Sequence, residues 1–145
     1  MTDYSVKSGA VEWHRLEGFD HLSYNVLNVD RDAQIVDVMF RYDANQRIAL
    51  HRHVALNHML VLEGNHHLYD PSGNLKEVRP AGRYTISPPD DEPHFEGGGE
   101  ADVIILFSIR GTDNVMYEFI DEQGDVALTF GMDDFEGLYL QQQAA

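Results

Sequence analysis

A pair of histidines separated by one residue is the first place where this sequence could do chemistry. His51 and His53 form the pair within LHRHVALNHMLVLEG, residues 50–64. Successive side chains of a strand alternate between its two faces, so on an extended strand both imidazoles can reach one metal ion. His94 offers a third nitrogen, because it follows two prolines and an acidic run in SPPDDEPHFE and precedes a strand-like segment. The pattern predicts one metal site held by these three histidines.

The remaining histidines and nearby carboxylates are weaker candidates. Glu92 lies beside His94 and could orient its ring through a carboxylate–imidazole hydrogen bond. His67 is in register with neither the histidine pair nor His94, and we expect it to donate a hydrogen bond to a metal ligand without binding the metal itself. The other histidines are expected at the surface or hydrogen-bonded in the core: His14, His21 and His66.

Composition limits the possible partners. The chain has 145 residues and no cysteine, so it fits one domain of 1–145, and any metal must be held by nitrogen and oxygen. Its net charge of −15 repels nucleic acid and anionic membranes, which leaves small molecules as the expected partners. The N-terminus MTDYSVKSGAVEW shows no secretory signal, and a cytoplasmic location is the default expectation.

The elements that position the histidines are expected to be strands. Apolar and polar residues alternate with period two in several segments, and no segment has a sustained helical period. QIVDVMFRY turns Val36, Val38, Phe40 and Tyr42 to one face, and ADVIILFSI is apolar on both faces, as in a central strand. Hairpins are predicted through the DPSG turn of residues 70–73 and the DEQG turn of 121–124. About ten strands indicate an all-β fold.

The ends of the chain and one glycine run complete this picture. The N-terminal region 1–34 contributes two strands around Gly18, and 111–145 adds a hairpin and a tail that holds a short helical turn or a strand. The run GGG at 97–99 predicts a flexible hairpin tip.

The histidine spacing resembles the cupin superfamily, whose motifs are G(x)5HxH(x)3-4E(x)6G and G(x)5PxG(x)2H(x)3N. His51, His53 and Gly64 match the first motif, and Gly82, Pro88 and His94 match the second with one extra residue. The match covers roughly residues 35–110. Within the superfamily the chain is similar to the RmlC-like, ChrR-like branch with acetylacetone-cleaving and 2,4'-dihydroxyacetophenone-cleaving dioxygenases. This resemblance implies a single-domain jelly-roll barrel.

The sequence departs from the first motif at its glutamate, and the fourth ligand stays open. Spacing from Gly64 places Asn57 at that position, whereas His58 has the better ligand chemistry, because imidazole binds Fe, Ni or Zn far better than a carboxamide does. The two residues face opposite sides of a strand, so only one can reach the metal. Barrel-lining side chains are expected from a further set: Met59, Val61, Tyr84, Phe95 and Phe107.

The resemblance implies a metal-dependent enzyme with one divalent ion, Fe(II) in preference to Zn or Ni. The implied reaction is oxidative C–C cleavage of a small diketone or hydroxyketone. The alternatives are a non-catalytic metal- or ligand-binding cupin, such as a ChrR-like sensor module, and a non-oxidative metal-dependent isomerase. Cupins of this shape usually pair, and the apolar terminal segments predict a homodimer.

Overall fold

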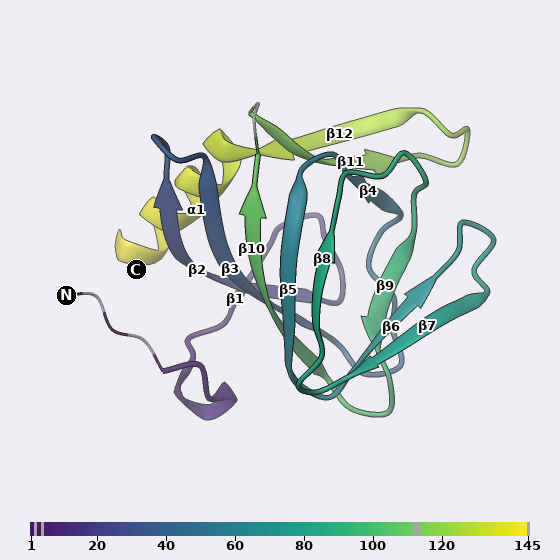
Figure 1. Ribbon diagram of the computed structural model, residues 1–145, viewed down its shortest axis with the longest axis horizontal. Coiled ribbons are helices and arrows are strands. Elements are labelled where there is room, and N and C mark those ends of the chain that lie inside the picture. The colour runs from purple at the N-terminus through teal and green to yellow at the C-terminus, as the bar shows by residue number, and fades with distance from the viewer. Residues whose placement is uncertain (2, 4, 112–113, 145) are drawn as a thin grey trace.

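Antiparallel strands form two layers that face each other across the core (Figure 1). The computed structural model describes residues 1, 3, 5–111 and 114–144. The strands of the first layer are β1 (His14–Arg15), β2 (Leu22–Asp30), β3 (Ile35–Tyr42), β5 (Leu56–Glu63), β8 (Tyr84–Ser87) and β10 (Val103–Arg110). They pair in the order β1-β2-β3-β10-β5-β8, all antiparallel.

The second layer consists of two smaller sheets, ordered β12-β11-β4 and β7-β6-β9. Their strands are β4 (His51–His53), β6 (Asn65–Tyr69), β7 (Leu75–Pro80), β9 (Phe95–Gly98), β11 (Val115–Ile120) and β12 (Val126–Gly131). An isolated antiparallel bridge between His51 and His94 connects β4 to the chain just before β9. The two small sheets therefore meet at the predicted metal ligands, and the whole is the antiparallel jelly-roll barrel that the resemblance implies.

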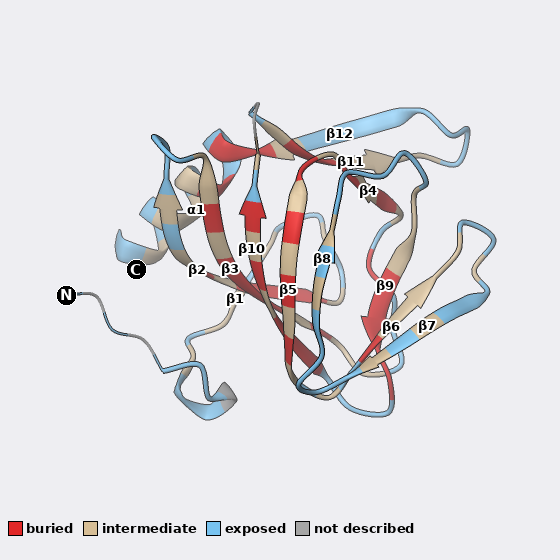
Figure 2. Ribbon diagram, viewed as in Figure 1, coloured by how far each residue is buried: buried red, intermediate tan, exposed pale blue. Residues whose placement is uncertain are grey.

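The core fills the space between the layers, as the period-two patterns predict. Val36, Val38, Phe40 and Tyr42 of β3 are all buried. Strand β10 lies between β3 and β5 and is buried along most of its length, which confirms it as a central strand (Figure 2). The two predicted hairpins are also present, as β6–β7 and β11–β12. The first sheet thus provides a rigid wall behind the site.

The C-terminal segment, for which the sequence allows a short helical turn or a strand, forms a longer helix. A 3-10 helix (Ser8–Ala10) lies near the N-terminus, and α1 (Met132–Ala144) packs beside β2 (Figure 1). The Asp133 N–H donates to Asn114 Oδ1 at 3.0 Å, which caps the first turn. The Gln142 side chain bonds both the N–H and the carbonyl of Val26, at 2.6 and 3.0 Å. Among the described residues, no helix combines the length and apolarity that crossing a bilayer requires.

The glycine run is structured rather than a flexible tip. Gly97 and Gly98 are buried residues of β9, and Gly97 pairs with Arg47 in an isolated bridge. A Cβ at Gly97 would stand 1.8 Å from the carbonyl oxygen of Gln46. Glycine is needed here because the neighbouring backbone passes too close for any side chain, and this close approach holds β9 in the barrel.

Candidate metal centre

Two short strand segments bring four potential ligands to one point. The His51 N–H donates to the His94 carbonyl at 3.1 Å, and the His94 N–H donates back to the His51 carbonyl at 2.8 Å. His53 and Glu96 each lie two residues further along their strands, so all four side chains leave the paired backbones on the same side. One ligand atom from each residue lies within 4.8 Å of the others. The structure therefore brings together the three predicted histidines and adds a carboxylate.

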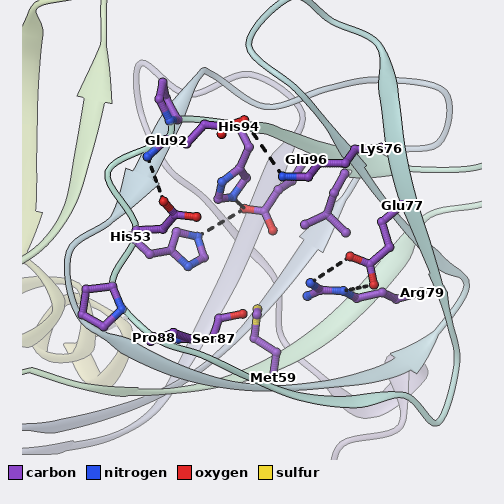
Figure 3. Close-up of a pocket in the computed structure, with 14 residues that line it drawn as sticks. His53, Met59, Lys76, Glu77, Arg79, Ser87, Pro88, Glu92, His94 and Glu96 are labelled. Atoms are coloured by element: carbon purple, nitrogen blue, oxygen red, sulfur yellow. Dashed lines mark hydrogen bonds and ion pairs between the residues drawn. The ribbon is translucent and has the colours of Figure 1, made fainter.

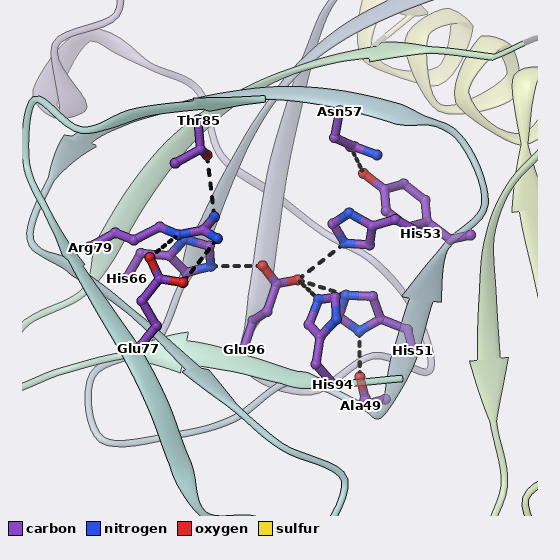
Figure 4. A network of polar contacts seen from close by, with 11 residues as sticks. Ala49, His51, His53, Asn57, His66, Glu77, Arg79, Thr85, His94 and Glu96 are labelled. Atoms are coloured by element: carbon purple, nitrogen blue, oxygen red, sulfur yellow. Dashed lines mark hydrogen bonds and ion pairs between the residues drawn. The ribbon is translucent and has the colours of Figure 1, made fainter. Parts of the chain in front are cut away.

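Glu96 stands at the centre of the cluster (Figure 4). Its Oε2 lies 2.6 Å from His51 Nε2, 3.4 Å from His94 Nε2 and 3.6 Å from His53 Nε2. The side chains of His51, His53 and Glu96 are 3%, 5% and 1% exposed, whereas His94 is 20% exposed. His94 therefore forms the solvent side of a group that is otherwise enclosed.

The arrangement of these polar atoms fits a shared cation. The Ala49 carbonyl accepts the Nδ1–H of His51 at 2.8 Å, which leaves the Nε2 of a neutral ring as a lone pair facing the carboxylate. The Nε2 atoms of His53 and His94 are buried without a hydrogen-bond partner and face the same oxygen. A positive ion placed among nitrogen lone pairs and a carboxylate is attracted by all of them. A divalent metal satisfies all four groups at once.

The protonation states also favour metal binding. Burial lowers the pKa of His53 to about 4, so its ring is neutral and its lone pair is free at neutral pH. Burial alone raises the pKa of Glu96, but the close approach of the four surrounding histidine rings outweighs it in the metal-free protein and holds that pKa well below its usual range. Glu96 as a carboxylate and His53 as a neutral imidazole are thus in the forms that coordinate metals.

The fourth member of this group of potential ligands is Glu96, and both residues that the sequence proposed lie elsewhere. Asn57 is fully buried and faces inward, but its Oδ1 accepts the Tyr117 hydroxyl at 3.0 Å and its Nδ2 donates to the Ala55 carbonyl at 3.0 Å. His58 lies on the opposite face of β5, where its Nδ1 bonds the Tyr84 hydroxyl. Both belong outside the cluster, because Asn57 already uses its amide and strand parity turns His58 outward.

The expected supporting residues also change. His67 bonds Tyr69 at 3.4 Å on the other face of β6, whereas its neighbour His66 is fully buried and its Nε2 lies 2.7 Å from Glu96 Oε1. His66 is thus the hydrogen-bonded core histidine that the sequence allowed, and it replaces His67 as the residue behind the ligands. The Glu92 side chain is 55% exposed and lies 4.0 Å from Lys76, so it is not oriented toward the His94 ring.

A pocket of about 200 Å³ leads to the cluster and ends on His53, His94 and Glu96 (Figure 3). Met59 lines it as predicted. Of the other expected lining residues, Val61 and Phe107 pack in the core, Tyr84 is 54% exposed on the outer face, and Phe95 stacks under Arg47. The wall comes instead from β6, β7, the end of β8 and the proline-rich turn before β9: Leu68, Lys76, Glu77, Arg79, Ser87, Pro88, Pro89, Asp90, Glu92 and Pro93.

Sequence reasoning missed Glu96 and the role of His66. The signal for Glu96 was present, because His94-Phe95-Glu96 repeats the alternation of His51-Arg52-His53. No local signal marked His66, since its contact with Glu96 depends on the pairing of β6 with β9.

Comparisons with known proteins agree with this geometry. An RmlC-like cupin protein from Ralstonia eutropha has a TM-score of 0.76 at 12% identity, covering 100% of this chain and 89% of that one. A putative acetylacetone dioxygenase from Methylibium petroleiphilum has a TM-score of 0.71 at 16% identity, with 96% and 95% covered. An acetylacetone dioxygenase from Acinetobacter johnsonii has a TM-score of 0.70 at 15% identity, with 97% and 99% covered. At these identities the likeness establishes the fold, a single-domain cupin jelly roll.

Among curated protein sequences, none matches this chain. The sequence profile of one family, described as the ChrR cupin-like domain, matches residues 1–112, most of the chain. This match, together with the barrel and its cluster of three histidines and a glutamate, shows that the chain belongs to the ChrR cupin-like family.

Proposed function

We propose that this protein is an Fe(II)-dependent dioxygenase that cleaves a carbon–carbon bond in a small diketone or hydroxyketone. The observation that carries the proposal is the buried group of His51, His53, His94 and Glu96 at the end of a pocket of about 200 Å³. A pocket of this size suits a compact substrate rather than a drug-sized one. Two solved structures that share the fold are described as acetylacetone dioxygenases, one of them as putative, and this supports the substrate class.

Charge balance favours an anionic substrate that binds through two oxygens. Glu96 brings one negative charge to a divalent ion, and the three histidines bring none, so one positive charge remains. A buried site is most stable when its charges cancel, because uncompensated charge is costly away from water. The enolate of a β-diketone carries one negative charge and two oxygens, and therefore completes the balance.

The residues of the chain supply binding and orientation. The Ala49 carbonyl fixes the ring of His51, and the pocket reaches His53 and His94 but not His51, so a substrate binds on the His53–His94 side. Met59 and Leu68 with the nearby prolines form an apolar wall that limits the entry of water. Iron, when bound, supplies the one-electron chemistry that lets oxygen react with an organic anion.

Oxygen consumption by the iron-loaded protein tests the proposal. We expect uptake with acetylacetone or a dihydroxyacetophenone, and none with the zinc-loaded protein, which has the same ligands but no redox chemistry. His94→Ala should abolish uptake by removing a ligand, whereas His58→Ala on the outer face should not. No uptake by the iron-loaded wild type with any diketone or hydroxyketone would contradict the dioxygenase proposal.

A second candidate function is that of a metal- or ligand-binding sensor domain without catalysis. The match to a family described by its ChrR cupin-like domain supports this alternative. A sensor would bind metal and be stabilised by a small ligand in thermal unfolding without consuming oxygen. A non-oxidative isomerase would convert its substrate under anaerobic conditions, which NMR of the reaction mixture would detect.

Assembly as a homodimer is also part of the proposal. Tyr84 and Ile86 on the edge strand β8 are 54% and 58% exposed, and Val126 and Leu128 on the edge strand β12 are also exposed. Exposed apolar side chains on edge strands are common where sheets pair between subunits. Sedimentation equilibrium would measure the assembly state, and a monomer at micromolar concentration would contradict this part.

A further inference from the structure

The carboxylate of Glu96 is divided between two sets of partners. Its Oε2 faces His51, His53 and His94, whereas its Oε1 lies 2.7 Å from His66 Nε2 on the opposite side (Figure 4). Glu96 and His66 are 1% and 0% exposed, so bulk solvent does not reach either oxygen. Only Oε2 is therefore available to the proposed metal.

Strand pairing fixes the contact between these two side chains. In the antiparallel pair of β6 and β9, His66 stands opposite Gly98 and Leu68 stands opposite Glu96. His66 and Glu96 are thus diagonal neighbours on the same face of the sheet, close enough for long side chains to meet. Tyr42 packs beside the His66 ring, with centroids 6.1 Å apart, which limits its movement. The backbone and the packing both hold His66 against the carboxylate.

The hydrogen-bonding pattern of His66 gives it the role of donor. Its Nδ1 is buried without a partner, and a neutral ring with its proton on Nε2 leaves only a lone pair unmatched there. An N–H at that position would be costlier to leave unpaired. His66 therefore donates Nε2–H to Oε1 of Glu96, and this bond prevents the carboxylate from rotating.

We propose that His66 is a positioning residue that restricts Glu96 to coordinate the metal through one oxygen and keeps a coordination position open toward the pocket. The inference rests on the proposed metal site but not on the reaction. A carboxylate free to rotate could bind with both oxygens and occupy the position that a chelating substrate needs. Residues that orient metal ligands in this way typically contribute about 10–100-fold to metal affinity.

Co²⁺ alone serves as the probe in the test, because its affinity and its visible spectrum both report on ligand number and geometry. The full-length protein is stripped of metal and titrated with Co²⁺ in wild type, His66→Phe, His66→Gln and His67→Phe. His66→Phe keeps a ring of similar size without a donor, whereas the amide of His66→Gln can still donate to Oε1. His67→Phe is the matched control, since His67 neighbours His66 on β6 but faces away from Glu96.

We expect His66→Phe to weaken Co²⁺ binding by about 10–100-fold and to change the visible spectrum. His66→Gln should restore both toward wild type, and His67→Phe should alter neither. A purely structural role for His66 would change thermal stability but would not give a spectrum that depends on the donor. Wild-type affinity and spectrum in His66→Phe would overturn the proposal, as would a loss in His66→Gln as large as in His66→Phe.

Two further outcomes are decisive. If circular dichroism shows that His66→Phe does not fold, His66→Asn replaces it, because its shorter amide stays polar but does not reach Oε1; wild-type Co²⁺ binding by that variant overturns the proposal. If wild type itself does not bind Co²⁺, the proposed metal site fails and the role of His66 with it. If the wild type binds Co²⁺ and His66→Phe binds it equally well, only the role of His66 is rejected. The proposed metal site then stands, whatever the oxygen assay shows.

Discussion

Two groups of histidines, one inside the barrel and one outside, come from neighbouring positions of the chain and have different chemistry. The inner histidines converge on Glu96: His51, His53, His66 and His94. The two outward-facing histidines of β5 and β6 each bond a tyrosine: His58 with Tyr84, and His67 with Tyr69. Since β5 and β6 each have one face inside, a shift of one residue exchanges a place beside the metal for a place on the surface. The face of the strand that a histidine occupies therefore decides whether it can reach the metal site.

The largest expected effect comes from removing an inner histidine. His51→Ala should lower the affinity for divalent metal by more than about 100-fold, because even residues that only orient ligands contribute about 10–100-fold. His58→Ala should bind metal like wild type, although the sequence offers His58 as a candidate for the fourth ligand. Isothermal titration with Co²⁺ measures both. Equal losses of Co²⁺ affinity in the two variants would show that facing the inside of the barrel does not decide which histidines hold the metal.

The pH dependence of stability should also separate the two groups. In the metal-free protein, burial holds the pKa of His53 at about 4, against about 6.5 in the unfolded chain. Between these pH values the unfolded chain binds a proton that the folded protein does not, so stability is full above pH 6.5 and falls as the pH drops to 4. The loss amounts to about 3 kcal/mol.

Glu96 should extend this loss to lower pH. Because its folded pKa is depressed, its contribution is present above its unfolded pKa, about 4.3, and disappears as the pH falls toward the folded value. Urea unfolding at pH 7, 4.5 and 3 measures the dependence in wild type, His53→Gln and the outer control His58→Gln, with the step from pH 4.5 to 3 reporting on Glu96. We expect a flatter dependence in His53→Gln alone, and equal slopes in all three proteins would argue against a buried neutral His53.

A smaller effect should show that facing inward is not sufficient to be a ligand. Asn57→Leu leaves the buried hydroxyl of Tyr117 without its acceptor and should cost about 1–3 kcal/mol in the free energy of unfolding. Metal affinity should not change, because the Asn57 amide is occupied by Tyr117 and Ala55. Combining Asn57→Leu with Tyr117→Phe should recover much of the stability, since both polar partners are then removed. A loss of metal in Asn57→Leu would instead identify Asn57 as a ligand.

The smallest effect is expected on the outer face. His58→Gln should change the free energy of unfolding by less than about 0.5 kcal/mol, as surface substitutions usually do. Urea unfolding at pH 7 measures this change in free energy. Asn57→Leu, at the adjacent and inward-facing position of β5, is the variant to compare with it. A change above about 1 kcal/mol would show that the bond to Tyr84 stabilises the sheet more than a surface contact normally does.

Much of the fold could be predicted because alternation along a strand is a local property. Val36, Val38, Phe40 and Tyr42 are buried as a set, and the turns at residues 70–73 and 121–124 connect the expected hairpins. The convergence of His51, His53 and His94 could also be predicted, because the two motifs place them at fixed points of the barrel. The helix Met132–Ala144 was harder to predict, since it depends on a cap from Asn114 and on packing against β2.

The histidine pair and the strand pattern around LHRHVALNHMLVLEG were determined by the sequence alone, because a period of two requires no knowledge of neighbouring strands. The identity of the fourth ligand depended on the tertiary structure. Glu96 joins the cluster because the chain before β9 pairs with β4 at His51 and His94, and His66 meets Glu96 because β6 pairs with β9. Such contacts join residues 30 or more positions apart, and the register between distant strands is set by the packing of the whole barrel.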